Sequence, residues 1–148
     1  MLQVLLVRHG QTASNAHGVL QGHLPIPLND LGRRQAAAVA EGLSRHRPEV
    51  EALVTSDLPR AVQTAEPIGR VLGLTATADT RWRERSFGSM EGQQVGDAEL
   101  WRAAAGTLNP PGAEPLEAMA ARVEAALVDL AQQQARRSCV AVVTHGGV

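Results

Sequence analysis

Two histidines stand at the ends of two apolar runs, near opposite ends of the chain. The run 2–7 leads into Arg8, His9 and a glycine, and the run 140–143 leads through one threonine into His145 and two glycines. Short runs rich in β-branched residues and stopped by glycine are typical of strands buried on both faces. If the two strands are neighbours in a parallel sheet, both imidazoles emerge at its carboxyl edge, where open α/β sheets bind ligands. Two imidazoles beside an arginine, a good fork for phosphate or carboxylate oxygens, predict chemistry on an anion.

Another arginine follows a third apolar run. Arg60 comes shortly after the run 52–55, within the segment SDLPRAVQTA (56–65). A helix is predicted to begin near Pro59, so Arg60 would lie in its first turn, where a cation opposes the helix dipole. A residue placed against that preference indicates contact with an anion, which the helix N-terminus would also attract. An exposed surface arginine is the alternative interpretation.

A carboxylate is available from the charged loop 81–92. If this loop is extended, side-chain alternation places Glu84 on one face and its neighbours Arg83 and Arg85 on the other. Glu84 would then face a pocket, while the arginines would face solvent or a carboxylate. Flanking arginines lower the pKa of a carboxyl group, so a role as general acid requires burial or a nearby dianionic substrate.

Three strand ends and one loop together supply five polar residues: Arg8, His9, Arg60, Glu84 and His145. Phosphoryl transfer requires an in-line nucleophile, cations around the equatorial oxygens and a proton for the leaving oxygen. Neutral imidazole is a suitable nucleophile. A metal-dependent phosphatase is an alternative, with His9, His145, Asp57 and Glu84 as ligands. The two arginines would repel a divalent cation, however, and metal sites for phosphate chemistry are richer in carboxylates.

The elements that position these residues alternate between strand and helix. Strands are predicted at 2–8, 52–55, 75–79 and 139–143, and helices at 29–43, from Pro59 onward, at 98–105 and at 116–134. Residues 10–28 are predicted as a polar loop, and Pro67 predicts a kink or restart in its helix. This alternation predicts an α/β fold with a mainly parallel sheet and helices on both faces.

Composition limits the class of protein. A chain of 148 residues, 44% hydrophobic and 20% charged, is typical of one globular domain. The net charge of −1 and the scarcity of aromatic residues argue against a nucleic-acid partner. No run has the length of a membrane span, and no signal-like segment opens the chain. The lone Cys139 lies in an apolar run, which predicts a buried thiol and a reducing, cytoplasmic location.

Six segments that cover nearly the whole chain carry a further pattern: RHGQTASN (8–15), LNDLGRRQA (28–36), SDLPRAVQTA (56–65), RERSFGSMEG (83–92), PPGAEPLEAMAARV (110–123) and VVTHGG (142–147). In this order they resemble the histidine phosphatase superfamily, in its phosphoglycerate mutase-like branch. The resemblance implies one domain over 1–148, a three-layer α/β/α fold with a mainly parallel sheet flanked by helices. That family usually continues past the second His-Gly with a helix and a strand, so we expect the domain to be C-terminally incomplete. Residues 113–115 read Ala-Glu-Pro where relatives often read Gly-Glu-Ser, which argues against a substrate contact there.

The resemblance also implies roles for the site residues. His9 would form a phosphohistidine, Arg8, Arg60 and His145 would hold the phosphoryl group, and Glu84 would protonate the leaving group and then help to activate water. Three more residues would line the phosphate pocket: Asn15, Gln21 and Gly22. The implied partner is a small phosphorylated metabolite, with neither a metal nor an organic cofactor and with no membrane partner. A homodimer is compatible with the resemblance.

Hydrolysis is the predicted reaction, with a phosphoglycerate mutase as the alternative. A mutase must shelter its phosphoenzyme from water, which requires extra covering structure and cations. The segment 91–111 is short and carries one arginine, Arg102, so we predict a phosphomonoesterase. A non-catalytic relative that binds partners or phospho-ligands is a third hypothesis, and the presence of all five central residues argues against it.

Overall fold

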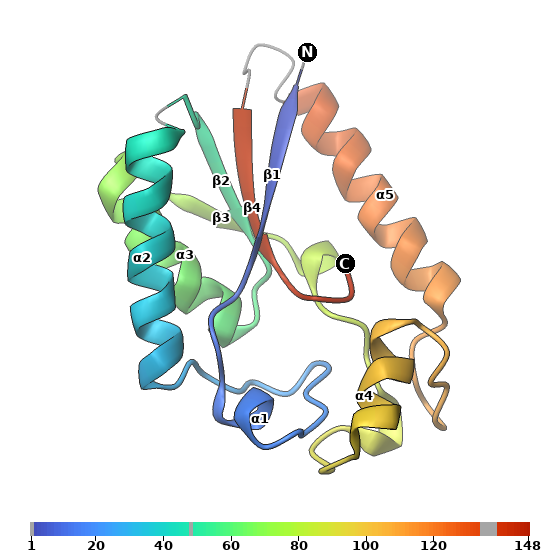
Figure 1. The fold of residues 1–148 in the computed structure, drawn as a ribbon. Coiled ribbons are helices and arrows are strands. Elements are labelled where there is room, and N and C mark those ends of the chain that lie inside the picture. Colours follow the sequence, from blue (N-terminus) through green and yellow to red (C-terminus); the bar gives the residue numbers. More distant parts are fainter. Residues whose placement is uncertain (1, 48, 134–138) are drawn as a thin grey trace.

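Four parallel strands form the central sheet of the computed structural model, which describes residues 2–47, 49–133 and 139–148. The strands are β1 (Gln3–Arg8), β2 (Ala52–Thr55), β3 (Ala76–Ala78) and β4 (Cys139–Thr144). Their order in the sheet is β1-β4-β2-β3, so the first and last strands along the chain are neighbours. Each of the three pairings is parallel, and β1, β4 and β2 end at the same edge of the sheet (Figure 1).

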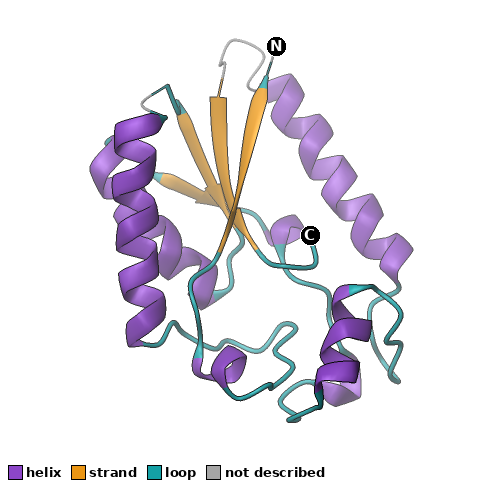
Figure 2. Ribbon diagram, in the orientation of Figure 1, coloured by secondary structure: helices purple, strands orange, loops and turns teal. Residues whose placement is uncertain are grey.

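Helices cover both faces of this sheet (Figure 2). The helices of the described residues are α1 (Ala13–Ala16), α2 (Asp30–His46), α3 (Pro59–Leu72), α4 (Asp97–Ala104) and α5 (Leu116–Gln133). Helices α2 and α3 pack together on one face, and α5 lies on the other. The short α1, α4 and the loops around them gather beyond the carboxyl ends of the strands. The predicted three-layer α/β/α fold is confirmed.

Strand β4 is the centre of the hydrophobic core. All six of its residues are buried. Because side chains alternate along a strand, Cys139 and Val143 pack into the cluster beneath α2 and α3, while Val140 and Val142 pack into the cluster beneath α5. Cys139 is fully buried, as predicted, and forms no disulfide.

A third apolar cluster lies away from the sheet, among the loops at its carboxyl edge. Leu20, Phe87 and Leu108 form its buried centre, and Leu100 and Ala103 of α4 pack against it. This cluster is not predictable from local patterns, because its members come from segments that were predicted only as loops or as one short helix.

One local prediction is wrong, and the restart offered as one alternative at Pro67 does not occur. The polar loop 10–28 contains the helix α1, which Thr12 caps through a reciprocal pair of hydrogen bonds with Asn15. Helix α3 runs without a break through Pro67, so no restart occurs. Proline removes one helical N–H donor, and the burial of Ile68 and other α3 residues against the sheet offsets that loss.

Residue Gln134, the predicted end of the last long helix, lies outside the described residues. Within 2–47, 49–133 and 139–148, none of the helices combines the length and the apolar character needed to cross a bilayer.

Candidate active site

The register of the sheet brings the two histidines together. Arg8 of β1 pairs with Thr144 of β4, so the residues that follow them, His9 and His145, leave the sheet side by side. The backbone N–H of His9 donates to the carbonyl of Thr144 at 3.0 Å, and the two imidazole centroids lie 5.1 Å apart with their planes tilted by 59°. The predicted meeting of the histidines at the carboxyl edge is confirmed.

His9 is held as a neutral imidazole. The residue is 8% exposed, and Nδ1 of its ring lies 2.7 Å from the carbonyl oxygen of Gly10. A carbonyl can only accept, so Nδ1 carries the hydrogen and Nε2 keeps its lone pair. Burial lowers the pKa of His9 to about 4; the hydrogen bond to Gly10 opposes this shift, and the charges of Arg60 and Arg8 add to it. The ring is therefore uncharged at neutral pH.

His145 is buried more deeply and is held by Ser56. Its Nε2 lies 2.8 Å from Ser56 Oγ, which also accepts the backbone N–H of Leu58 at 3.3 Å. We assign the serine hydroxyl hydrogen to Nε2, which leaves the ring hydrogen on Nδ1. Burial, followed by the charges of Arg60 and His9, lowers the pKa of His145 to about 2, so this ring is also neutral.

Arg60, near the start of α3, links the carboxyl edge of the sheet to the loop that contains Gly22 and Leu24. Its guanidinium is almost fully buried and donates to the carbonyls of Gly22, at 2.7 Å, and Leu24, at 3.0 Å. Burial lowers the pKa of Arg60 to about 10, while the charges of Glu84 and Glu91 oppose this shift, so the side chain stays cationic at neutral pH. Gly22 has a positive φ of 47°, a backbone conformation that favours glycine, and this turn presents its carbonyl to the arginine.

Two nitrogens of the site lack a partner. Among the described residues, three buried side-chain nitrogens make no hydrogen bond, and two of them are Arg60 Nε and His145 Nδ1. Buried N–H groups are nearly always paired in folded proteins. The other cation, Arg8, is exposed and makes no hydrogen bond or ion pair within the described part of the chain; its guanidinium lies over the backbone of Gly146. These donors are therefore available to an anion.

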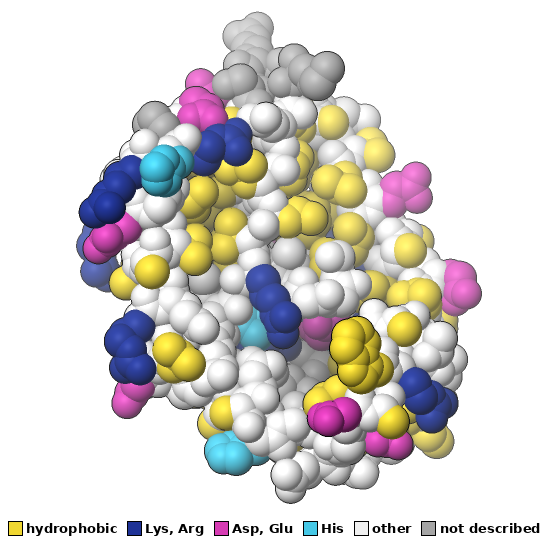
Figure 3. Space-filling view, in the orientation of Figure 1, with side chains coloured by type: hydrophobic (Ala, Val, Ile, Leu, Met, Phe, Trp, Pro, Cys, Tyr) yellow, Lys and Arg dark blue, Asp and Glu magenta, His cyan; other side chains and the backbone are white. Residues whose placement is uncertain are grey.

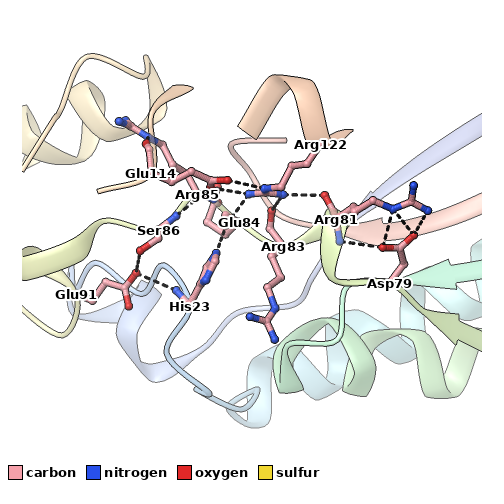
Figure 4. A network of polar contacts seen from close by, with 10 residues as sticks. All are labelled: His23, Asp79, Arg81, Arg83, Glu84, Arg85, Ser86, Glu91, Glu114 and Arg122. Atoms are coloured by element: carbon pink, nitrogen blue, oxygen red, sulfur yellow. Dashed lines mark hydrogen bonds and ion pairs between the residues drawn. The ribbon is translucent and has the colours of Figure 1, made fainter. Parts of the chain in front are cut away.

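Glu84 is fixed at both its backbone and its side chain (Figure 4). One carboxylate oxygen accepts the N–H of Arg85 at 2.8 Å, and the other accepts the N–H of Gly147 at 3.2 Å. The backbone carbonyl of Glu84 accepts Nε2–H of His23 at 2.7 Å and a guanidinium N–H of Arg122 at 3.0 Å. A Cβ atom at Gly147 would overlap the carboxylate, so this close approach requires glycine.

The arginines on either side of Glu84 behave differently from each other. Arg83 forms a two-pronged ion pair with Asp57, at 2.5 and 2.7 Å, in agreement with the expectation that it faces a carboxylate. The expectation for Arg85 is wrong: the side chain is 2% exposed and donates to the backbone carbonyls of Glu114, at 2.7 Å, and Leu108, at 2.9 Å. The loop before α5 folds over Arg85 and supplies these acceptor carbonyls. Side-chain alternation along an extended segment gives no information about a loop that packs over it from elsewhere in the chain.

Arg122 of α5 holds the loop around Glu84 from the other side. It donates to both carboxylate oxygens of Glu114, at 2.7 and 2.8 Å. It also donates to the backbone carbonyls of Arg81 and Arg83, at 2.7 and 2.8 Å (Figure 4). The carboxylate of Glu114 therefore holds the side chain of Arg122, whose contacts here are structural. Sequence reasoning missed Arg122 because no local pattern distinguishes it from the other charged residues of a helix.

The predicted site residues surround one cavity of about 190 Å³. Seven of the eight line it directly: Arg8, His9, Asn15, Gln21, Gly22, Arg60 and Glu84. The eighth, His145, lies against the ring of His9. Figure 3 shows an arginine, a histidine and an acidic side chain meeting at this hollow, with hydrophobic side chains on one side of it. A second cavity, of about 440 Å³, shares Arg8, His9 and Asn15 but contains neither Arg60 nor Glu84.

The alternative metal site does not form. Asp57, one of its four ligands, is paired with Arg83. Across the described ranges, no three His, Cys, Asp or Glu side chains gather closely enough to hold a metal ion. The cations of the site are arginines, which suit phosphate oxygens directly.

Comparisons with known proteins agree with this geometry. The sequence matches the histidine phosphatase superfamily (branch 1) over residues 4–148. Phosphoglycerate mutase-like protein 4 of Arabidopsis thaliana is 36% identical over 99% of this chain and 67% of its own length. Glucosyl-3-phosphoglycerate phosphatase of Mycobacterium tuberculosis is 35% identical over 99% of this chain and 71% of its own length.

Solved structures give the same result. A mycobacterial glucosyl-3-phosphoglycerate phosphatase with bound VO3 superposes with a TM-score of 0.87 at 34% identity, over 99% of this chain and 77% of that one. YhfR of Bacillus stearothermophilus superposes with a TM-score of 0.85 at 26% identity, over 99% and 75%. A named phosphatase among both the sequence and the structural relatives favours the phosphatase prediction over the mutase. The chain belongs to branch 1 of the histidine phosphatase superfamily, as its motifs predict.

Proposed function

We propose that the protein hydrolyses small phosphomonoesters through a phosphohistidine on Nε2 of His9. The observation that carries the proposal is the hydrogen bond from Nδ1 of His9 to Gly10, because it leaves a neutral ring with its lone pair on Nε2. Two arginines that line the same cavity as His9, and a second neutral imidazole next to its ring, can together bind the three outer oxygens of a phosphoryl group.

Each step uses groups already in place. Nε2 of His9 attacks phosphorus while the bond from phosphorus to the leaving oxygen breaks, and Glu84 gives that oxygen its proton. Arg8, Arg60 and the Nδ1–H of His145 bind the phosphoryl oxygens. Glu84, now ionised, takes a proton from water, whose oxygen attacks phosphorus, and the nitrogen–phosphorus bond breaks to release inorganic phosphate.

We further propose that the reaction needs no metal ion. Arg8 and Arg60 supply the positive charge that a metal would otherwise supply to the phosphoryl oxygens. Because the Mycobacterium tuberculosis relative is named for glucosyl-3-phosphoglycerate, phosphorylated metabolites are the substrate class to test first.

Trapping of the intermediate tests the mechanism. Protein mixed with ³²P-labelled p-nitrophenyl phosphate in EDTA, then quenched in alkali, should carry label that is stable in base and lost in acid. His9→Asn retains the hydrogen bond to Gly10 but has no nucleophile, so it should carry no label. His46→Asn changes an exposed histidine of α2 and should be labelled like the wild type. Label that persists in His9→Asn, or turnover that EDTA abolishes, would contradict the proposal.

The mutase alternative has a separate readout. Incubation with 3-phosphoglycerate, with and without a bisphosphoglycerate primer, should release inorganic phosphate at the same rate in both cases. Formation of 2-phosphoglycerate that depends on the primer would instead establish a mutase.

A further inference from the structure

One wall of the 190 Å³ cavity is apolar. Its apolar lining residues are Val19, Leu20, Phe87, Leu100, Ala103 and Ala104. Leu20 and Phe87 are buried members of the cluster at the sheet edge, and Leu100 and Ala103 of α4 pack against that cluster. The wall is therefore part of a packed core and is present before any ligand binds.

The leaving group must lie in this cavity. Glu84, which has to reach the leaving oxygen, lines the 190 Å³ cavity, whereas the 440 Å³ cavity does not contain it. A substrate whose phosphoryl group lies between His9 and Arg60 therefore directs its alcohol portion past Glu84 and along the apolar wall.

Charge along this path disfavours a second anionic group. Within the described residues, the cations that line the cavity are Arg8 and Arg60, and both are needed by the phosphoryl group. The neighbouring arginines are engaged elsewhere, because Arg83 pairs with Asp57 and Arg85 binds loop carbonyls. A carboxylate on the alcohol portion would lose water without gaining a cation and would lie near Glu84.

The wall continues outside the cavity. Leu100 and Ala104 also line a shallow hollow on α4 together with Trp101 and Asp97. Trp101 is 77% exposed. A single exposed apolar side chain is ordinary, but this indole adjoins the apolar wall at the cavity mouth, and Asp97 beside it adds further negative charge.

We propose that this wall and Trp101 bind the leaving group, so that the protein prefers phosphomonoesters of uncharged, apolar alcohols to those that carry a carboxylate. The proposal rests on the proposed phosphatase function. It commits that site to one substrate class, since an apolar group gains burial against Phe87 and Leu100 while an anionic group gains no further cation.

Three phosphate esters of primary alcohols, which differ in the polarity and charge of the alcohol portion, test the preference: 2-phenylethyl phosphate, glycerol 3-phosphate and 3-phosphoglycerate. We expect kcat/KM to fall in this order, by at least about tenfold between the first and the last. Equal values, or a preference for 3-phosphoglycerate, would overturn the proposal while leaving the phosphatase function intact.

A charge placed on the wall should reverse the preference. Ala104→Arg adds a cation at an exposed position that lines the cavity, and it should shift the ratio of kcat/KM values toward 3-phosphoglycerate by about tenfold. Ala105→Arg adds the same charge one residue further along, where the side chain does not line the cavity, and should leave the ratio unchanged. Equal shifts in the two variants would mean that net charge, and not the wall, sets the preference.

Binding without turnover separates this proposal from the mechanism. The fluorescence of Trp101 should respond to 2-phenylethylphosphonate at a concentration at least about tenfold lower than to 3-phosphonopropionate, and Trp101→Ala should abolish the response. If no phosphate ester is hydrolysed but this binding order holds, the proposed function fails and the binding preference stands. If hydrolysis occurs and the binding order is reversed, the preference fails and the function stands.

Discussion

The two buried imidazoles should make the fold sensitive to mild acid. His9 and His145 have pKa values of about 4 and about 2 in the folded protein, below the ordinary value of 6.5, chiefly because burial disfavours the charged ring. The unfolded chain therefore binds these two protons at a higher pH than the folded protein does. Stability that is complete above about pH 6.5 is lost as the pH falls toward the folded pKa values.

The size of the effect follows from the shifts. At about pH 5, both rings are still neutral in the folded state and protonated in the unfolded state. Each then lowers the free energy of unfolding by roughly 1.4 kcal/mol for every pH unit below 6.5, or about 2 kcal/mol. The two together should lower it by about 4 kcal/mol between about pH 7.5 and about pH 5. Most carboxylates remain ionised throughout this interval, so their contribution is small.

Urea denaturation at the two pH values measures the effect, in buffers free of phosphate because an anion bound at the site would stabilise the folded state. His145→Gln, which keeps an acceptor for Ser56, should halve the pH-dependent loss, and His9→Asn should do the same. His46→Gln, at an exposed position on α2, should lose as much as the wild type. A wild-type loss below about 1 kcal/mol, or the same loss in all four proteins, would refute the reasoning.

Three further predictions concern groups that support the site. Ser56→Ala should lower kcat by about tenfold with little change in KM, because the hydroxyl no longer selects the tautomer of His145. Gly147→Ala should also lower kcat by about tenfold, because the added methyl would displace the carboxylate of Glu84. Arg122→Met should lower the free energy of unfolding by about 3 kcal/mol in urea denaturation, because it leaves a partly buried carboxylate without its partner.

The residues at the strand ends could be predicted from the sequence because one rule governs them. A buried parallel strand is recognisable from its apolar run, and the residue after it is placed at the carboxyl edge whatever the rest of the fold does. His9 and His145 follow this rule. Ser56 follows it too, directly after β2, so its place at the same edge as the histidines was also predictable.

The surroundings of Glu84 could not be predicted in the same way. Its position depends on His23, Arg122 and Gly147, which lie 61, 38 and 63 residues away along the chain. None of these separations follows from a helical or strand period, so no local pattern identifies the contacts. The apolar wall could not be predicted for the same reason, since Leu20, Phe87 and Leu100 come together only when the loops fold over the sheet edge.

The residues that were predictable from the sequence concern the reaction, and those that were not concern the choice of substrate. The residues that would transfer the phosphoryl group lie mostly on strand ends, where the sheet fixes their spacing and the loops have little influence. The residues that would select the alcohol lie on loops and on α4, which pack against one another in the cluster around Phe87. Substitutions on α4, such as Ala104→Arg, should therefore change which phosphomonoester is preferred while the phosphohistidine on His9 still forms. The motifs that identified the family contain the first group almost completely and the second hardly at all, which is why sequence reasoning reached the reaction type but not the substrate class.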